Sequence, residues 1–80
     1  MPRLFTSTRF RKNFKKQSGA IQQLASEREK IFLANSFDPR LGTHKLHGKD
    51  SEQWSYAITR KIRIKFTFVT PNIVMYLVPH

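Results

Sequence analysis

The stretch FDPRLGTHKLHG, residues 37–48, is followed after a polar gap by WSYAITRKIRIKFTF, residues 54–68. Asp38-Pro39 should stop a helix, because the residue before a proline avoids the α region of backbone space. The second stretch alternates apolar with cationic residues, and this period of two predicts a strand with one apolar and one cationic face. Histidines and arginines would then lie on a small sheet, where they could bind the phosphate of a nucleic acid.

The segments after residue 48 predict the rest of this sheet. Arg60-Lys61 and Pro71-Asn72 are turn signals that separate three runs with strand character. The last run is continuously apolar, which is typical of a strand covered on both faces. Leu46 is expected in a shorter strand that enters the sheet. The predicted strands are residues 54–58, 62–69 and 73–78, with an edge strand over residues 3–6.

Two helices are predicted between the edge strand and the sheet. Residues 9–16 are basic, with Phe10 and Phe14 one turn apart on an apolar face, and Ser7 or Thr8 is a candidate cap. Ser18-Gly19 breaks this pattern, and residues 20–35 carry an apolar stripe at helical spacing. The sequence therefore predicts one α+β domain over residues 1–80. It begins with a short strand and a two-helix hairpin, and a three- to four-stranded, mainly antiparallel sheet follows.

The charge of the chain is strongly unbalanced. Fifteen Lys and Arg oppose five Asp and Glu, which gives a formal net charge of +10. Such a field attracts polyanions and disfavours self-association. RNA, DNA, an acidic lipid surface and an acidic protein all remain open as partners on charge alone.

Residue types that the sequence lacks narrow the function further. The chain has no cysteine, which excludes a disulfide framework, a thiolate zinc site and a cysteine nucleophile, and fits a reducing cytoplasm. Neither a signal peptide nor an apolar run of about 20 residues is present, so we expect a cytoplasmic protein that does not span a membrane. His44 and His47 have no third ligand nearby in the sequence, so we expect no metal or cofactor.

The order of these motifs resembles the RelE/ParE toxin superfamily of type II toxin–antitoxin modules. The resemblance covers nearly the whole chain and rests on four pieces: FDPRLGTHKLHG, the WSYAI strand at 54–58, the IRIKF strand at 62–66 and the final Pro79-His80. It implies a RelE/ParE-like fold. It also implies a toxin of the RelE and YafQ kind, a ribosome-dependent endoribonuclease that cleaves mRNA.

The resemblance also implies a set of site residues. Arg63 matches the arginine that holds the scissile phosphate, and His44 and His80 match histidines in acid or base roles. Histidine titrates near neutrality, and the arginine fork matches a phosphate, so these residue types suit RNA cleavage. The further cations expected to bind phosphate or RNA are Lys45, His47, Arg60, Lys61 and Lys65.

The sequence departs from the family pattern at several positions. Trp54 and Tyr56 stand where RelE has catalytic lysines, and Val78 replaces a glycine. The acidic and aromatic residues that usually follow His80 are absent, so we expect a member shortened at its C-terminus. These departures leave open a ParE-like inhibitor of DNA gyrase and a binding module whose catalytic set has decayed. Composition alone also permits a small basic nucleic-acid-binding protein without catalysis.

The resemblance implies partners as well. They are mRNA, the ribosome and a cognate antitoxin. An acidic antitoxin segment would complement the basic first helix and the sheet face of Arg63 and Lys65. We therefore expect this segment to cover Arg63 and to compete with RNA.

Overall fold

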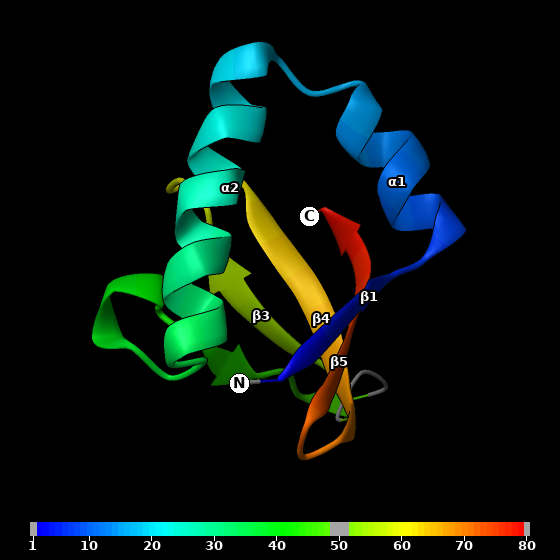
Figure 1. Cartoon of the computed structure of the whole chain (residues 1–80), viewed down its shortest axis with the longest axis vertical. Coiled ribbons are helices and arrows are strands. Elements are labelled where there is room, and N and C mark those ends of the chain that lie inside the picture. The colour runs from blue at the N-terminus through cyan, green and yellow to red at the C-terminus, as the bar shows by residue number, and fades with distance from the viewer. Residues whose placement is uncertain (1, 49–51, 80) are drawn as a thin grey trace.

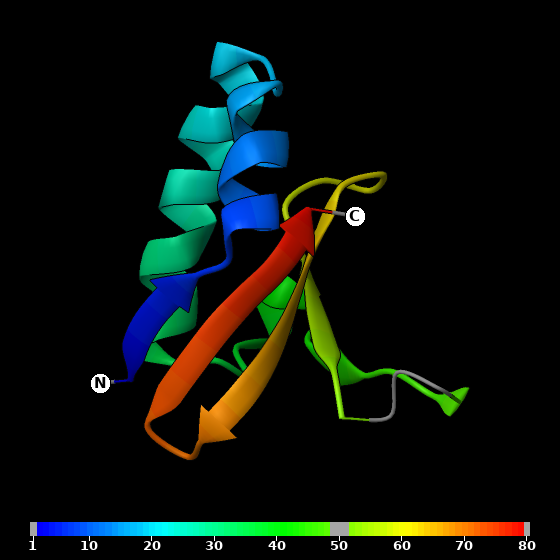
Figure 2. The same cartoon turned by 90° about the vertical axis from the view of Figure 1, so that its right-hand side faces the viewer.

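The computed structural model describes residues 2–48 and 52–79 of the chain. Two helices lie together on one side of a single twisted sheet, and no helix formed by the described residues covers the other side (Figures 1 and 2). The elements in chain order are β1 (Arg3–Thr6), α1 (Thr8–Lys15), α2 (Gly19–Ala34), the 3₁₀ turn η1 (Pro39–Leu41), β2 (His44–Lys45), β3 (Trp54–Ala57), β4 (Arg63–Thr70) and β5 (Ile73–Pro79).

The sheet has five strands in the order β1-β5-β4-β3-β2. The N-terminal strand β1 runs parallel to β5, whereas the other neighbouring pairs are antiparallel. The predicted α+β fold is therefore confirmed, with β1 and β2 at the two edges. The chain enters the sheet at one edge, crosses it with both helices and returns through β2, β3, β4 and β5.

Side-chain caps fix where both helices begin. The Ser7 hydroxyl accepts a hydrogen bond from the Phe10 N–H at 2.9 Å, and the Ser18 hydroxyl accepts one from the Ile21 N–H at 3.2 Å. Each bond satisfies a backbone donor that the first helical turn leaves without a partner. Phe10 then packs into the core and stacks on Phe14, with ring centroids 5.5 Å apart. The apolar face predicted for this helix is thus confirmed.

The core lies between the helices and one face of the sheet, and aromatic rings dominate it. Phe32 of α2 is fully buried, with ring centroids 4.7 Å from Tyr56 and 4.8 Å from Phe66. The Tyr56 and Tyr76 hydroxyls are hydrogen-bonded at 2.6 Å inside this core. Burial raises the pKa of Glu29 on α2, and its hydrogen bond to Tyr76 acts in the opposite direction. The core therefore holds a small polar network beside its apolar rings.

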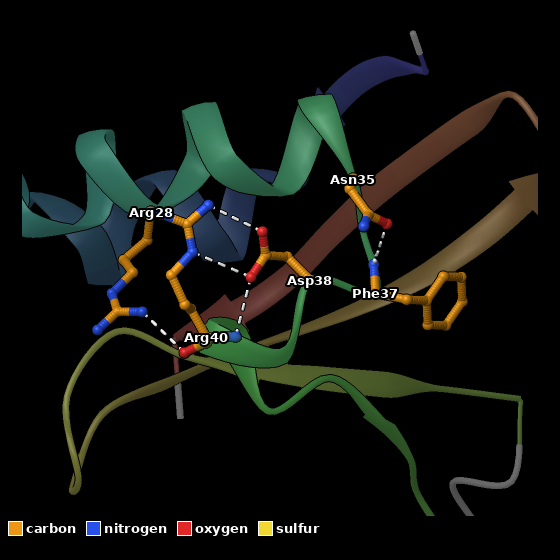
Figure 3. A network of polar contacts seen from close by, with 5 residues as sticks. All are labelled: Arg28, Asn35, Phe37, Asp38 and Arg40. Atoms are coloured by element: carbon orange, nitrogen blue, oxygen red, sulfur yellow. Dashed lines mark hydrogen bonds and ion pairs between the residues drawn. The ribbon is translucent and has the colours of Figure 1, made fainter.

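Several predicted boundaries need correction. Helix α2 spans Gly19–Ala34 where residues 20–35 were predicted, and the chain leaves the helix before Asp38-Pro39. Asn35 is extended there, and its side chain accepts a hydrogen bond from the Phe37 N–H at 3.0 Å (Figure 3). Strand β2 is limited to His44–Lys45, so the prediction that Leu46 lies within it is wrong.

Strand β5 also differs from its prediction. Val74 and Tyr76 are buried, whereas Ile73, Met75 and Leu77 are half-exposed. The expectation of a strand covered on both faces is therefore wrong. The reason is the topology: both helices pack on one face, so alternate residues of β5 point to a face that no helix covers (Figure 2).

Candidate functional site

The loop between α2 and β2 is held by charged side chains (Figure 3). Asp38 caps η1 by accepting from the Arg40 N–H at 2.9 Å, and it also binds the Arg40 guanidinium at 3.0 and 2.8 Å. From α2, Arg28 donates to the Arg40 carbonyl at 2.8 Å. The hydrogen bonds to Arg40 hold the pKa of Asp38 down at about 2. This loop is thus a fixed turn at neutral pH.

Gly42 ends that turn and directs its carbonyl toward the sheet. Its φ is +60°, a left-handed conformation that favours glycine. The preceding Leu41 is fully buried and anchors the turn in the core. In this conformation the Gly42 carbonyl accepts a hydrogen bond from Arg63 Nη2 at 2.8 Å. The glycine of the FDPRLGTHKLHG stretch therefore positions an acceptor for an arginine 21 residues later.

Arg63 is the centre of a constellation on the open face of the sheet. Its Nε donates to the Ser55 hydroxyl at 3.0 Å, and its Nη2 lies 3.2 Å from His44 Nδ1. Ser55 is only 1% exposed, although it lies on the face that carries no helix. These contacts fix the guanidinium beside the imidazole. The structure thus brings together two of the three predicted catalytic residues.

The contacts of His44 define two states of its ring. A guanidinium nitrogen can only donate, so Nδ1 must accept when it bonds Arg63, and Nε2 then carries the proton. Nδ1 also lies 3.1 Å from the Gly42 carbonyl, and that bond requires a proton on Nδ1. The site therefore offers a partner for His44 both as an acceptor and as a donor. General acid–base catalysis uses the neutral and the protonated imidazole, and the Gly42 carbonyl can accept from Nδ1 in the protonated form.

A separate cavity of about 400 Å³ lies further along β4, at Lys65. Lys65 lies on it, directly across from Ser55 and two residues from Arg63. Gln53 Oε1 is buried there and has no hydrogen-bond partner among the described residues, so it is available to a ligand or to water. The cavity is lined by Ser7, Arg9, Gln53, Lys65, Leu77 and Val78.

The other predicted site residues are more scattered. Lys45 pairs with Trp54, so it lies on the opposite side of the sheet from His44. Arg60 and Lys61 are exposed in the turn between β3 and β4, at the Arg63 end of β4. His47 is exposed beyond β2. His80 lies outside the described residues, whereas Pro79 before it pairs with Ile64.

Three residues of the site were not predicted as site residues from the sequence. Ser55 carries the hydrogen bond that orients Arg63, and Arg9 and Gln53 line the cavity. Gln53 and Ser55 are two residues apart, so the alternation of strand side chains places both on the face away from the core. The sequence contained this signal. Arg9 belongs to α1 and reaches the cavity through the packing of that helix. Its role is visible only in three dimensions.

A metal centre or a membrane-spanning helix would each point to another kind of function. Within residues 2–48 and 52–79, no three His, Cys, Asp or Glu side chains gather closely enough to hold a metal ion. In the same described part of the chain, no helix is both long and apolar enough to cross a membrane.

The fold can be compared with solved structures. The YoeB/ParE toxin from Agrobacterium tumefaciens superposes with a TM-score of 0.80 over 98% of this chain and 95% of that one, at 11% identity. YafQ from E. coli strain BL21(DE3) gives a TM-score of 0.80 at 10% identity, over 99% of this chain and 91% of that one. The YoeB-YefM toxin-antitoxin complex from Staphylococcus aureus gives 0.79 at 16% identity, over 99% and 94%.

Sequence comparison alone finds no such relation. No protein-family model matches the chain, and no curated protein is significantly similar to it in sequence. The structural similarity nevertheless spans nearly all of both chains. The protein therefore has the RelE/ParE-like toxin fold, as the order of its sequence motifs predicts.

Proposed function

We propose that this protein is the toxin of a type II toxin–antitoxin module and cleaves mRNA on the ribosome. The observation that carries the proposal is the pairing of Arg63 with His44 on the open face of a toxin fold, at 3.2 Å. The Arg63 guanidinium, which can bind a phosphate, lies there beside the His44 imidazole, which can act as an acid or a base. Such a pair supplies two of the three groups that cleavage through the 2′-hydroxyl uses, namely a cation for the developing charge and one acid or base.

The chemistry uses the 2′-hydroxyl of the RNA itself. A base removes the proton of the 2′-hydroxyl, whose oxygen attacks the neighbouring phosphorus. The bond to the 5′-oxygen then breaks, and an acid protonates this leaving oxygen, which gives a 2′,3′-cyclic phosphate and a free 5′-hydroxyl. His44 supplies one of these proton transfers and His80 the other. Arg63 neutralises the charge that develops on the phosphate.

The cavity at Lys65, two residues along β4 from Arg63, binds a neighbouring nucleotide. Arg9 and Lys65 place positive charge along it, and the unpartnered Gln53 Oε1 accepts a hydrogen bond from the RNA. The net charge of +10 attracts a polyanion over a longer range. His47, Arg60 and Lys61 are exposed cations that add phosphate contacts around this path.

The partner that neutralises the toxin is a cognate antitoxin. The S. aureus structure is a toxin–antitoxin complex, and the same kind of partner suits a chain with this fold. An acidic antitoxin segment covers Arg63 and competes with RNA. Both the ribosome and such an antitoxin place the protein in the cytoplasm.

Induced expression in bacteria tests the proposal. The wild-type chain should arrest growth and produce mRNA cuts in phase with codons, and Arg63→Ala should relieve both. Arg3→Ala is the matched control, because Arg3 is an exposed arginine on the far edge strand β1 and should leave the arrest intact. A soluble, folded wild-type chain without effect on growth overturns the proposal. Arrest with intact mRNA and a DNA-damage response selects a gyrase inhibitor instead.

A further inference from the structure

A second surface of the molecule is apolar and open to solvent. Phe37 and Val69 are 55% and 58% exposed, and a hollow of about 460 Å³ lies among the side chains there. Phe37, Trp54 and Phe68 form its wall, with ring centroids between 5.4 and 6.1 Å apart. We call this surface the aromatic patch, defined by Phe37, Trp54, Phe68, Val69, Thr70 and Pro71.

The aromatic patch is separate from the Arg63 site. Phe68 lies five residues beyond Arg63 on β4, which is about 16 Å along an extended strand. The two side chains also lie on opposite faces, since Phe68 packs against the core and Arg63 lies on the open face. RNA held on the open face therefore leaves the aromatic patch uncovered.

The local structure keeps these rings at the surface. Asn35 turns the chain out of α2 by bonding the Phe37 N–H, and Figure 3 shows Phe37 at the end of that turn, away from the Arg28–Asp38–Arg40 cluster. Trp54 begins β3 and meets Phe37 edge-on. Exposed apolar patches of this kind commonly mark sites of interaction with other proteins.

Charge decides which partner fits. Lys45 is exposed and is the cross-strand partner of Trp54, so a cation flanks the aromatic rings. The neighbouring acid Asp38 is already engaged by Arg40 at 2.8 Å. A second copy of the chain would bring another charge of +10 to the surface, which opposes association. An acidic segment with a large apolar side chain complements both the charge and the rings.

We propose that the aromatic patch is a docking site for an acidic segment of a partner protein, which inserts an aromatic or aliphatic anchor between Phe37, Trp54 and Phe68. The inference rests on the proposed toxin function in that the partner is the neutralising antitoxin. It extends that function, because it gives the partner a second contact on the opposite side of the sheet from Arg63. A segment held there does not itself block the RNA path.

Trp54 provides a direct assay, because it is the chain's single tryptophan and lies in the patch. The probe is a short synthetic peptide rich in glutamate with a central Phe-Leu pair. Its titration should change the Trp54 fluorescence to saturation, and added salt should weaken binding. A peptide with the same charge but alanine at both anchor positions should bind at least about tenfold more weakly.

Matched variants separate the patch from general charge. Phe37→Ala should weaken binding of the Phe-Leu peptide at least about tenfold. Phe5→Ala is the control, because Phe5 is also an exposed phenylalanine, at 44%, but lies on β1 away from the patch. Glu52 is exposed two residues before Trp54 and opposes an acidic partner, so Glu52→Gln should tighten binding. Equal affinity of the Phe37→Ala and Phe5→Ala variants overturns the proposal.

The remaining outcomes are also decisive. Equal binding of the two peptides shows that charge alone attracts them, and overturns the docking site. Concentration-dependent dimerisation of the peptide-free chain that Phe37→Ala abolishes assigns the patch to self-association instead. Growth arrest is measured separately, and Phe37→Ala should retain it. If the wild-type chain causes no arrest but the peptide still binds through Phe37, the toxin proposal fails while the docking surface stands.

Discussion

The two faces of β4 differ in almost every property. Toward the helices it presents Ile64 and Phe66, which are at most 1% exposed and contribute to the aromatic core. Toward the open side it presents Arg63 and Lys65, which are half-exposed, line the proposed RNA path and alternate with the buried residues. One face of β4 therefore contributes to the hydrophobic core, and the other face contributes residues to the candidate site. Substitutions on the two faces should have separable effects.

The largest expected effect on stability is on the core side. Phe32 is fully buried and contacts Tyr56, Phe66 and Tyr76 through its ring. Phe32→Ala should cost about 3–5 kcal/mol of unfolding free energy, because it leaves a cavity among three rings. Urea denaturation followed by circular dichroism measures this loss. Phe5→Ala, at a partly exposed position, should cost much less, and similar costs for the two variants would contradict the assignment of the core.

The open side should show the reverse behaviour. His44→Gln removes the acid–base group but keeps a polar side chain at an exposed position. We expect the rate of RNA cleavage to fall about 10²- to 10⁴-fold, while the urea midpoint stays near that of the wild type. Single-turnover cleavage on purified ribosomes measures the rate. A variant that retains full activity would remove His44 from the mechanism.

The sequence predicted the two faces well because the period of two requires only local information. Ser7 was likewise one of two predicted caps, with Thr8 as the alternative, since the capping pattern is local. The contact of Arg63 with Gly42 was not predictable in this way, because it joins residues 21 positions apart across three elements. Lys45 and His44 are neighbours in sequence but point to opposite faces, because strand side chains alternate. Arg9 reaches the site only through helix packing.

The hydrogen-bonded pair of Tyr56 and Tyr76 in the core should show an effect on stability that is smaller than that of Phe32→Ala. Tyr76→Phe removes one hydroxyl of the 2.6 Å pair and leaves the Tyr56 hydroxyl without this partner. The expected cost is about 1–3 kcal/mol of unfolding free energy, because a buried donor without its hydrogen bond is unfavourable. The double variant Tyr56→Phe/Tyr76→Phe should cost less than the sum of the two single variants. Strict additivity in this cycle would show that the hydroxyls are not coupled.

The two glycines with positive φ can separate an effect on stability from an effect on the candidate site. Gly42 and Gly48 have φ of +60° and +76°, so alanine at either position should cost about 1 kcal/mol from backbone strain. Only Gly42 places its carbonyl against Arg63. Gly42→Ala should therefore lower cleavage beyond its effect on stability, whereas Gly48→Ala should lower stability alone. Equal activities of the two variants would show that the Gly42 carbonyl does not position Arg63.

The smallest expected effect concerns acid pH. The pKa of Asp38 is lowered from 3.8 to about 2 by its hydrogen bonds to Arg40, so its contribution to stability is present above pH 3.8 and is lost as pH falls toward 2. Glu29 has a raised pKa, so its contribution has the opposite sign and is lost as pH rises through that pKa. Asp38→Asn should flatten the loss of stability below pH 3.8, as thermal unfolding across pH would show. The same loss of stability at acid pH in Asp38→Asn and the wild type would contradict this role of Asp38.

Cleavage of a defined mRNA on purified translating ribosomes tests the central claim most directly. The wild-type chain and Arg63→Ala are compared at equal concentration, after circular dichroism has shown that both are folded, and primer extension maps the 5′ ends. The account predicts codon-phased cuts by the wild type and a loss of about 10²- to 10³-fold in Arg63→Ala, because the fork on the scissile phosphate is missing. Cutting of equal strength by Arg63→Ala, or no cutting by the folded wild type, would contradict it.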